Sequence, residues 1–233
     1  MLYNEEAVRA NIRNREGKRI FYLGKGDQLT SAARDYLSRE RIEIRPGEQA
    51  KQDCFPLLTG GFLTEKPEHM THLNGDFLVV KDHPRIIFRG KLDTLESELI
   101  LCQLTDRRLE APVGEILELA RRIIRCEVLD EPLQWDRLCG LTEEEQRKRS
   151  HFPQDYYGQP HFMPSAADGA AIARLNRARC AAREAELAAV TAFRDREGNP
   201  TRVDILRAMN RMSSMLYLLM IGKRADAGRG KER

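Results

Sequence analysis

From about residue 82 onward, apolar residues recur at intervals of three and four, the spacing of an amphipathic α-helix. Four such stretches follow one another, each of about 20 residues. Their apolar positions are Phe88, Leu92, Leu95, Leu99 and Cys102; Val113, Ile116, Leu117, Ala120, Ile123 and Ile124; Ala171, Leu175, Ala178, Ala182, Ala185 and Ala189; and Ile205, Met209, Met212, Leu216 and Leu219. The pattern predicts a mainly α fold, an up-and-down bundle of four or five helices over residues 81–224.

The two ends of the chain differ from this helical region. Residues 18–23 and 41–45 are typical of short strands, and they flank an expected helix at 29–40 with Thr30 or Ser31 as its cap. We therefore expect residues 1–80 to form a small N-terminal α/β appendage. Its last part is rich in glycine and proline and is either a linker or a lid over an active site. The polar tail at 225–233 is expected to be disordered.

Composition excludes several classes of protein. The net charge is +3, and most basic residues have acidic neighbours, which is not typical of a nucleic-acid binder. No apolar run approaches the roughly 18 residues of a membrane span, and the first residues lack the pattern of a signal peptide. The five cysteines include no Cys-x-x-Cys pair, which favours a reducing cytoplasm.

The third helical stretch carries a charged stripe. Arg179, Arg183 and Glu186 stand at i, i+4 and i+7, so they project from one face of a helix. Guanidinium groups suit the binding of carboxylates and phosphates in fixed geometry. The stripe is therefore a candidate site for a polyphosphate, and the alternative is a solvated face stabilised by local ion pairs.

A second polar cluster enters the first bundle helix at residues 81–85 and continues to Arg89 and Asp93. Spacing allows Asp93 to pair with Arg89 one turn away. It equally allows Asp93 to orient an arginine elsewhere, since a buried carboxylate needs a partner.

A third polar cluster lies in the fourth helix. Asn210, Ser213, Ser214 and Tyr217 fall on the face opposite the apolar stripe. Asn and Ser are unfavourable inside helices, so either a polar function or a solvated face is indicated.

Together the three clusters resemble the ATP:corrinoid adenosyltransferases. The resemblance lies in residues 162–186, 210–214 and 81–93, and it is strongest to the ethanolamine-utilization type. Further segments that resemble this type are 29–34, 66–73, 83–93, 130–133 and 208–214. The segments cover nearly the whole chain in the same order.

The resemblance implies transfer of the 5′-deoxyadenosyl group of ATP to the cobalt of reduced cob(I)alamin, giving adenosylcobalamin and triphosphate. Arginines and Mg²⁺ would stabilise the leaving triphosphate. The implied catalytic residues are Arg183 at the triphosphate, Arg179 paired with Asp93 across a subunit boundary, and Glu186, which orients Arg183 or contacts a neighbouring subunit.

The implied ATP-binding residues are Asn210, which would hold the nucleotide, and Lys81 and Arg85, which would close over the phosphates with Arg183. Phe162 is the candidate for the apolar side chain below the corrin that displaces the axial cobalt ligand, and His161 competes for that position.

The sequence departs from the family in one respect. Some ethanolamine-type members carry a His and a cysteine cluster that binds a divalent metal, whereas the corresponding segment, 52–61, has only Cys54. His69 and His72 lack a convincing third ligand. We therefore expect no structural Fe or Zn.

The implied partners are ATP, cobalamin, a reductase and ethanolamine ammonia-lyase. The family favours trimers with sites between subunits, and a dimer is the alternative. The implied location is the cytoplasm, with a bacterial microcompartment as a further option. The alternative function is a helical-bundle corrinoid carrier or scaffold without catalysis.

Overall fold

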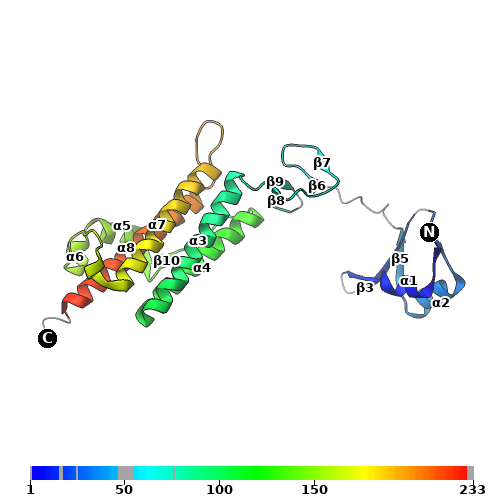
Figure 1. The fold of residues 1–233 in the computed structure, drawn as a ribbon, viewed down its shortest axis with the longest axis horizontal. Helices are drawn as coiled ribbons and strands as arrows, with labels where there is room; N and C mark the ends of the chain where they lie inside the picture. Colours follow the sequence, from blue (N-terminus) through cyan, green and yellow to red (C-terminus); the bar gives the residue numbers. More distant parts are fainter. Residues whose placement is uncertain (1, 16–17, 25, 47–54, 76, 230–233) are drawn as a thin grey trace. The chain divides into compact units, whose positions relative to one another are not determined.

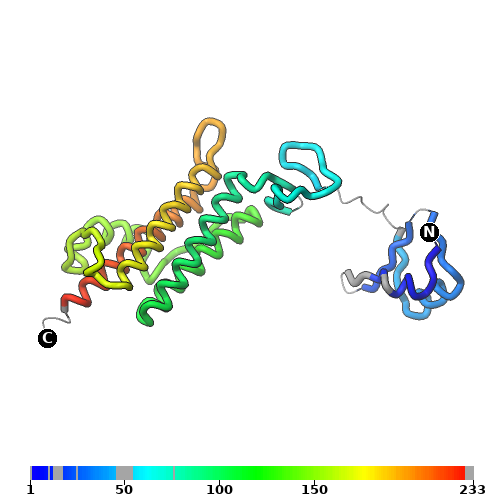
Figure 2. The backbone as a smooth tube through the Cα atoms, viewed as in Figure 1, coloured from blue at the N-terminus to red at the C-terminus, as the bar shows by residue number. Residues whose placement is uncertain are grey.

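The computed structural model describes residues 2–15, 18–24, 26–46, 55–75 and 77–229 (Figures 1 and 2). The chain divides into two compact units, Met1–Glu68 and His69–Arg233. The predicted division at residue 80 therefore lies too late. The hairpin of β8 (Met70–His72) and β9 (Leu78–Val80) belongs to the second unit, because Arg89 donates to the Leu73 carbonyl oxygen at 2.6 Å.

The N-terminal unit contains the predicted β-α-β arrangement. Strands β3 (Lys18–Leu23) and β5 (Glu43–Pro46) pair in parallel, and α2 (Ser31–Arg39) connects them. Thr30 caps α2, since its side chain accepts from the Ala33 N–H at 3.2 Å. The other elements are too short to show a period in the sequence: β1 (Leu2–Tyr3), α1 (Glu5–Ala10), β2 (Arg13–Arg15), β4 (Gln28–Leu29), β6 (Phe55–Pro56) and β7 (Phe62–Leu63).

This unit has its own small core. The core lies between α1, α2 and the strands and consists of Val8, Phe21, Leu29, Ala33, Tyr36, Leu37 and Ile42. A core of this size supports a small folding unit, as the composition of the segment predicts.

Four long helices form the second unit, and they lie side by side in Figure 1. They are α3 (Pro84–Thr105), α4 (Glu110–Leu129), α7 (Gly169–Ala192) and α8 (Val203–Arg229). Almost every position of the four predicted apolar stripes is buried in one continuous core, so the mainly α fold is confirmed. None of the helices in the described ranges combines the length and apolar content needed to cross a bilayer.

The chain directions in the bundle do not simply alternate. Helices α3 and α7 run antiparallel, because Lys91 pairs with Glu184 at 2.9 Å and Glu98 with Arg177 at 3.1 Å. Helix α4 is antiparallel to α3, and α8 to α7, so α4 and α7 run in the same direction. Each bundle helix is nevertheless antiparallel to its neighbours.

The long connection from α4 to α7 produces this order by returning along the bundle. It contains β10 (Arg137–Leu138), β11 (Leu141–Thr142), α5 (Glu143–His151), α6 (Pro153–Tyr157) and the 3₁₀ turn η2 (Ala166–Asp168). A second 3₁₀ turn, η1 (Arg107–Leu109), joins α3 to α4. Helices α5 and α6 pack on α8.

Helix α8 extends further than expected. It continues through the buried Ala225 to Arg229, so residues 225–229 of the predicted disordered tail are helical. Packing of Ala225 gives the last turns a tertiary contact that the polar composition does not reveal. Residues 230–233 lie outside the described residues.

Candidate active site

Two predicted site residues meet where α7 and α8 pack together. The amide nitrogen Nδ2 of Asn210 donates to Glu186 Oε1 at 2.9 Å. Both side chains are half-buried. Asn210 and Glu186 come from different sequence clusters, so the antiparallel packing of α7 and α8 joins the predicted nucleotide-binding amide to the charged stripe.

Two helical turns away, the same helices form a second contact. The guanidinium carbon of Arg179 lies 5.4 Å from the centre of the Tyr217 ring. Seven residues separate Arg179 from Glu186 and Tyr217 from Asn210, which is about 10 Å along a helix. The two contacts are therefore successive levels of one α7–α8 face.

Between these levels lies Arg183, which is exposed. The antiparallel register places it opposite Ser213, whose hydroxyl donates to the Asn210 carbonyl oxygen at 3.0 Å. Within the ranges that the structure describes, no hydrogen bond or ion pair of the Arg183 side chain is found. Its guanidinium is thus free to receive an anion.

Phe162 reaches the Arg179 level from the connection before α7. Its backbone N–H donates to the Tyr217 hydroxyl at 3.2 Å, and the two rings stack with centres 6.2 Å apart. The Arg224 guanidinium carbon lies over the Phe162 ring, 4.3 Å from its centre. His161 stacks on Tyr217 as well, with ring centres 5.8 Å apart. The structure therefore brings the candidate corrinoid residue to the same face as Arg179.

Arg211 adds a charge that spacing did not reveal. It donates to the Asn210 carboxamide oxygen, and its Nε is buried without a hydrogen-bond partner among the described residues. Burial lowers the pKa of the Arg211 guanidinium, and Glu143 only partly offsets this effect. A cation in such surroundings increases the positive potential beside Asn210.

Asp93 does not pair with Arg89, although spacing allowed that contact. It lies exposed on α3, and its side chain has no ion-pair partner within the described part of this chain. Arg89 instead binds Glu127 of α4. The predicted pairing of Asp93 with Arg179 requires a neighbouring subunit, and it stays a prediction.

Arg85 and Arg89 converge on one buried carboxylate. Glu127 is completely buried at the end of α4, where one oxygen accepts from Arg85 and the other from Arg89 at 2.5 Å. Arg85 also donates to the Glu127 carbonyl oxygen at 2.7 Å. We name this group of three side chains the Glu127 clamp. It engages two nitrogens of the Arg85 guanidinium, and a role of Arg85 at the phosphates stays a prediction.

Lys81 and His83 lie just before the clamp. Lys81 is exposed at the end of β9, and its backbone N–H donates to the His69 carbonyl oxygen at 2.9 Å. His83 caps α3 by accepting from the Arg85 N–H at 3.2 Å. Burial and then the nearby Arg85 cation lower the pKa of the His83 imidazole, which favours the neutral, accepting form.

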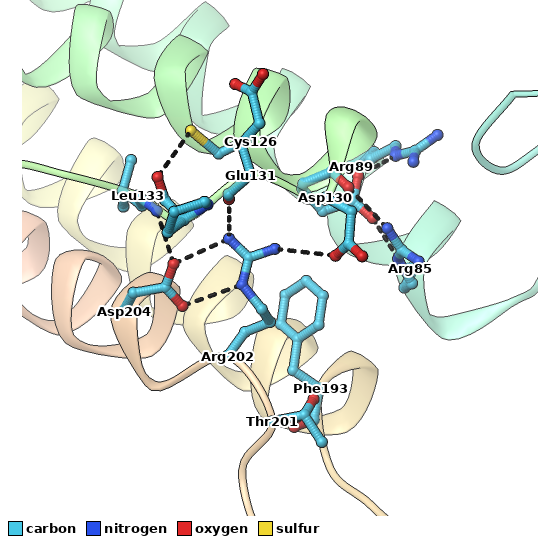
Figure 3. Close-up of polar contacts among 12 residues, drawn as sticks. Arg85, Arg89, Cys126, Asp130, Glu131, Leu133, Phe193, Thr201, Arg202 and Asp204 are labelled. Carbon is cyan, nitrogen blue, oxygen red and sulfur yellow. Dashed lines mark hydrogen bonds and ion pairs between the residues drawn. The ribbon is translucent and has the colours of Figure 1, made fainter.

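A third arginine, Arg202, is paired near the same end of the bundle. Figure 3 shows Arg202 in contact with Asp204 and with the Glu131 carbonyl oxygen, to which it donates at 2.8 Å, while Arg85 and Arg89 approach the end of α4. Arg202 binds Asp204 with two nitrogens at 3.0 and 2.9 Å. These contacts fasten the start of α8 to the end of α4.

Two cavities lie away from the predicted residues. A cavity of about 290 Å³ lies between α4, the β10–β11 hairpin, α6 and α8, and its α8 residues are on the face opposite Asn210 and Tyr217. A cavity of about 490 Å³ borders the Leu133–Asp136 segment, α5 and the start of α8. Neither of these two cavities is lined by a predicted site residue.

No group of three or more potential metal-ligating side chains gathers in the part of the chain that the structure describes. Cys54, on which the sequence argument about Fe and Zn depends, lies outside the described residues. The absence of a structural metal therefore stays a prediction.

Comparison with known proteins identifies the family of the chain. A family model described as cobalamin adenosyltransferase matches residues 62–222, which include every predicted site residue. The chain belongs to the cobalamin adenosyltransferase family. A corrinoid adenosyltransferase, EutT, from Salmonella typhimurium is 32% identical over 241 residues, covering 93% of this chain and 90% of the relative. EutT of Escherichia coli K12 is 30% identical with the same coverage.

Membership of the cobalamin adenosyltransferase family confirms the enzyme class that the sequence predicts and favours it over a carrier without catalysis. The matched region includes α3, α4 and α7 and extends along α8 to residue 222, and the EutT relatives also cover most of the N-terminal unit. The resemblance to the ethanolamine-utilization type is therefore confirmed by relatives of that name.

Sequence reasoning missed two structural features of this adenosyltransferase. Glu127 could have been found, because it continues the apolar stripe of α4 three residues after Ile124, where a carboxylate must be buried and paired. The buried Arg211 Nε without a hydrogen-bond partner among the described residues had no comparable signal in the sequence. Its surroundings arise from the packing of α5 against α8.

Proposed function

We propose that this chain transfers the 5′-deoxyadenosyl group of ATP to the cobalt of cob(I)alamin. The lone pair of cobalt(I) forms a bond to the ribose C5′, the C5′–O bond breaks, and triphosphate leaves with that electron pair. The products are adenosylcobalamin and triphosphate. The observation that carries the proposal is the single α7–α8 face, which joins the charged stripe of α7, the polar cluster of α8 and Phe162.

The face has an order along the bundle that suits two substrates. Asn210 and Glu186 form one level, at which we place the nucleotide, and Arg179 with Phe162 forms the other, at which we place the corrinoid. Arg183 lies between them. The bond that breaks joins the nucleoside to the triphosphate, so a cation between the two levels is well placed to stabilise the leaving group.

We assign Arg183 to the triphosphate because its guanidinium, unlike that of Arg179, has no hydrogen bond or ion pair among the described residues. A fixed guanidinium can donate to two phosphate oxygens at once, and it stabilises charge that increases as the C5′–O bond breaks. Glu186 holds Asn210 and limits its rotation, so that the amide is preorganised for the nucleotide. Lys81 is an exposed cation that could close over the phosphates, as proposed for Arg85.

Mg²⁺ is proposed to arrive as a complex with the triphosphate. The described residues offer no cluster of three ligands for a resident divalent ion. Mg²⁺ commonly binds through substrate phosphates and one or two carboxylates. The protein's own contribution to stabilising the charge of the triphosphate therefore comes from its arginines.

Asp93 supports an oligomeric enzyme. It is exposed on α3 and lacks a side-chain ion pair within the described ranges, which leaves it available to Arg179 of a second copy. We propose a homo-oligomer, a trimer in preference to a dimer, with Asp93 and Arg179 meeting at the boundary. Sedimentation of the wild type and of Asp93→Arg tests this assignment, because the charge reversal is expected to dissociate the assembly.

The physiological role is proposed from the EutT relatives. We propose that the product supplies ethanolamine ammonia-lyase, that a reductase provides cobalt(I), and that the enzyme works in the cytoplasm, in association with a bacterial microcompartment.

The decisive experiment is an anaerobic assay of the full chain with ATP, Mg²⁺ and chemically reduced cobalamin. Adenosylcobalamin is followed by its visible spectrum, and the phosphate product is separated by ion-exchange chromatography. We expect equal amounts of adenosylcobalamin and triphosphate. Absence of adenosylcobalamin, or its formation without triphosphate, would contradict the proposal.

A further inference from the structure

Tyr217 stands at the centre of the second level of the α7–α8 face. Its hydroxyl contacts the Phe162 N–H and the His161 ring, and its ring contacts Phe162 and Arg179. Tyr217 is half-buried on α8, and the resemblance assigned no role to it. The side chain thus touches both residues, Phe162 and Arg179, that form the proposed corrinoid level of the face.

The hydrogen bonds around the hydroxyl have a defined direction. His161 Nε2 lies 3.3 Å from the His151 carbonyl oxygen, which can only accept, so this nitrogen carries a hydrogen. In neutral imidazole Nδ1 is then an acceptor, and it receives the Tyr217 O–H at 3.1 Å. The Tyr217 oxygen in turn accepts from the Phe162 N–H at 3.2 Å. One hydroxyl therefore satisfies both neighbours.

These bonds hold a segment that lacks other regular structure. Residues 159–165 form neither helix nor strand between α6 and η2. Fixing each such residue costs conformational entropy, which side-chain contacts must offset. Arg224 of α8 also lies over the Phe162 ring, so two contacts of this ring come from α8.

The ring of Tyr217 has a separate effect on Arg179. A guanidinium within about 6 Å of an aromatic ring is attracted to its face. This contact leaves the donors of Arg179 available, apart from a bond of 3.5 Å to the Asn176 side-chain oxygen. The ring therefore fixes the direction of Arg179 without consuming its hydrogen-bonding groups.

We infer that Tyr217 is a positioning residue whose hydroxyl fixes Phe162 for the corrinoid and whose ring supports Arg179. The inference rests on the proposed function, because Phe162 and Arg179 receive their roles from it. Tyr217 does not react with either substrate. It couples the geometry of the corrinoid side of the face to that of the stripe on α7.

Two substitutions separate the effects of hydroxyl and ring. Tyr217→Phe removes only the hydroxyl, and we expect the KM for cob(I)alamin to rise about fivefold, since a lost hydrogen bond of this kind changes affinity by roughly two- to tenfold. The KM for ATP is expected to stay within about twofold, a change too small to count as a lost hydrogen bond. Tyr217→Leu removes the ring as well as the hydroxyl. For this variant we expect kcat to fall in addition to the rise in KM, because Arg179 loses its support.

Hydrogen exchange provides a readout that does not need turnover. In Tyr217→Phe, exchange of the peptide that covers residues 159–165 is expected to accelerate, because the Phe162 N–H loses its acceptor. The matched control is Tyr157→Phe, the same chemical change in a half-buried tyrosine that lines the cavity on the opposite face of α8. The control is expected to alter neither exchange nor KM.

Unchanged exchange in Tyr217→Phe would overturn the inference, and so would faster exchange with an unchanged KM for cob(I)alamin. A wild type that shows no adenosyl transfer would contradict the proposed function instead. In that case the binding of cob(II)alamin, followed by its visible spectrum, replaces KM. Equal binding by wild type and Tyr217→Phe would then overturn the positioning role.

Discussion

Arginines have different surroundings in two regions of the bundle. In the Glu127 clamp and around Arg202, guanidinium groups bind carboxylates and backbone carbonyl oxygens of the same chain. On the α7–α8 face, Arg183 is exposed and has no such partner within the described ranges. The same side-chain type therefore fastens helices at one place and is available to an anion at the other.

The difference shows that the role of an arginine depends on where its counter-charge lies. The family resemblance implied a place at the phosphates for both Arg85 and Arg183. The counter-charge of Arg85 is 42 residues away on α4, and that of Arg183 is expected to come with the substrate. Each of the following substitutions alters one side of this contrast.

Arg183→Ala should have the largest effect on catalysis. Loss of one preorganised donor to developing charge lowers kcat about 10²–10³-fold. Stability should not change, since the side chain is exposed and unpaired in the described structure. Adenosylcobalamin formation and urea unfolding measure the two properties, with Arg196→Ala in the exposed α7–α8 loop as control. An activity loss below about tenfold would contradict the assignment of Arg183 to the triphosphate.

Glu127→Gln should have the largest effect on stability. The substitution leaves two half-buried arginines without their carboxylate, which is expected to cost about 3 kcal/mol of unfolding free energy. Urea unfolding at pH 7 measures the loss, and Glu118→Gln on the exposed side of α4 is the control. A fall in the unfolding free energy of less than about 1 kcal/mol would mean that water replaces the lost hydrogen bonds. The Glu127 clamp would then not fasten α3 to α4 as we describe.

Asp106→Asn should change the acid sensitivity of the fold. The Lys223 ammonium, together with the Arg108 N–H, holds the pKa of the Asp106 carboxyl well below its ordinary value. Because the folded pKa is lowered, the stabilisation is present above the unfolded value of about 3.9 and is lost as pH falls below it. The urea midpoint of the wild type should therefore fall more steeply than that of Asp106→Asn between about pH 5 and 2.5.

The control for this pH series is Asp136→Asn, since Asp136 is almost fully exposed. Its profile should follow the wild type. A profile of Asp106→Asn that also follows the wild type would show that Asp106 and Lys223 do not stabilise the junction of α3, α4 and α8.

Glu184→Gln should have the smallest effect. Glu184 binds Lys91 and Arg177 on the surface at 2.9 and 3.4 Å, and all three side chains are more than two-fifths exposed. Solvent and salt screen such pairs, so we expect no measurable change in the urea midpoint at 0.15 M salt. A large change would mean that pairing on the α3–α7 surface contributes as the buried Glu127 clamp does.

Much of the fold could be predicted because its signal is local. The apolar stripes of the four long helices repeat at helical spacing, and Thr30 caps α2 as its position indicates. The shortest strands escaped prediction, since β1, β4, β6 and β7 have two residues each and cannot show a period of two. The direction of α7 relative to α4 also escaped, because it depends on how the long connection folds back along the bundle.

The sequence by itself determined which residues could meet a charged substrate. Helical spacing put Arg179, Arg183 and Glu186 on one face of α7, and Asn210 and Tyr217 on one face of α8, because the backbone geometry of a helix is fixed. Tertiary structure alone decided which of these groups remain available. The partners of Arg85, Asn210 and Phe162 lie 42, 24 and 55 residues away, and only packing of the helices brings them into contact.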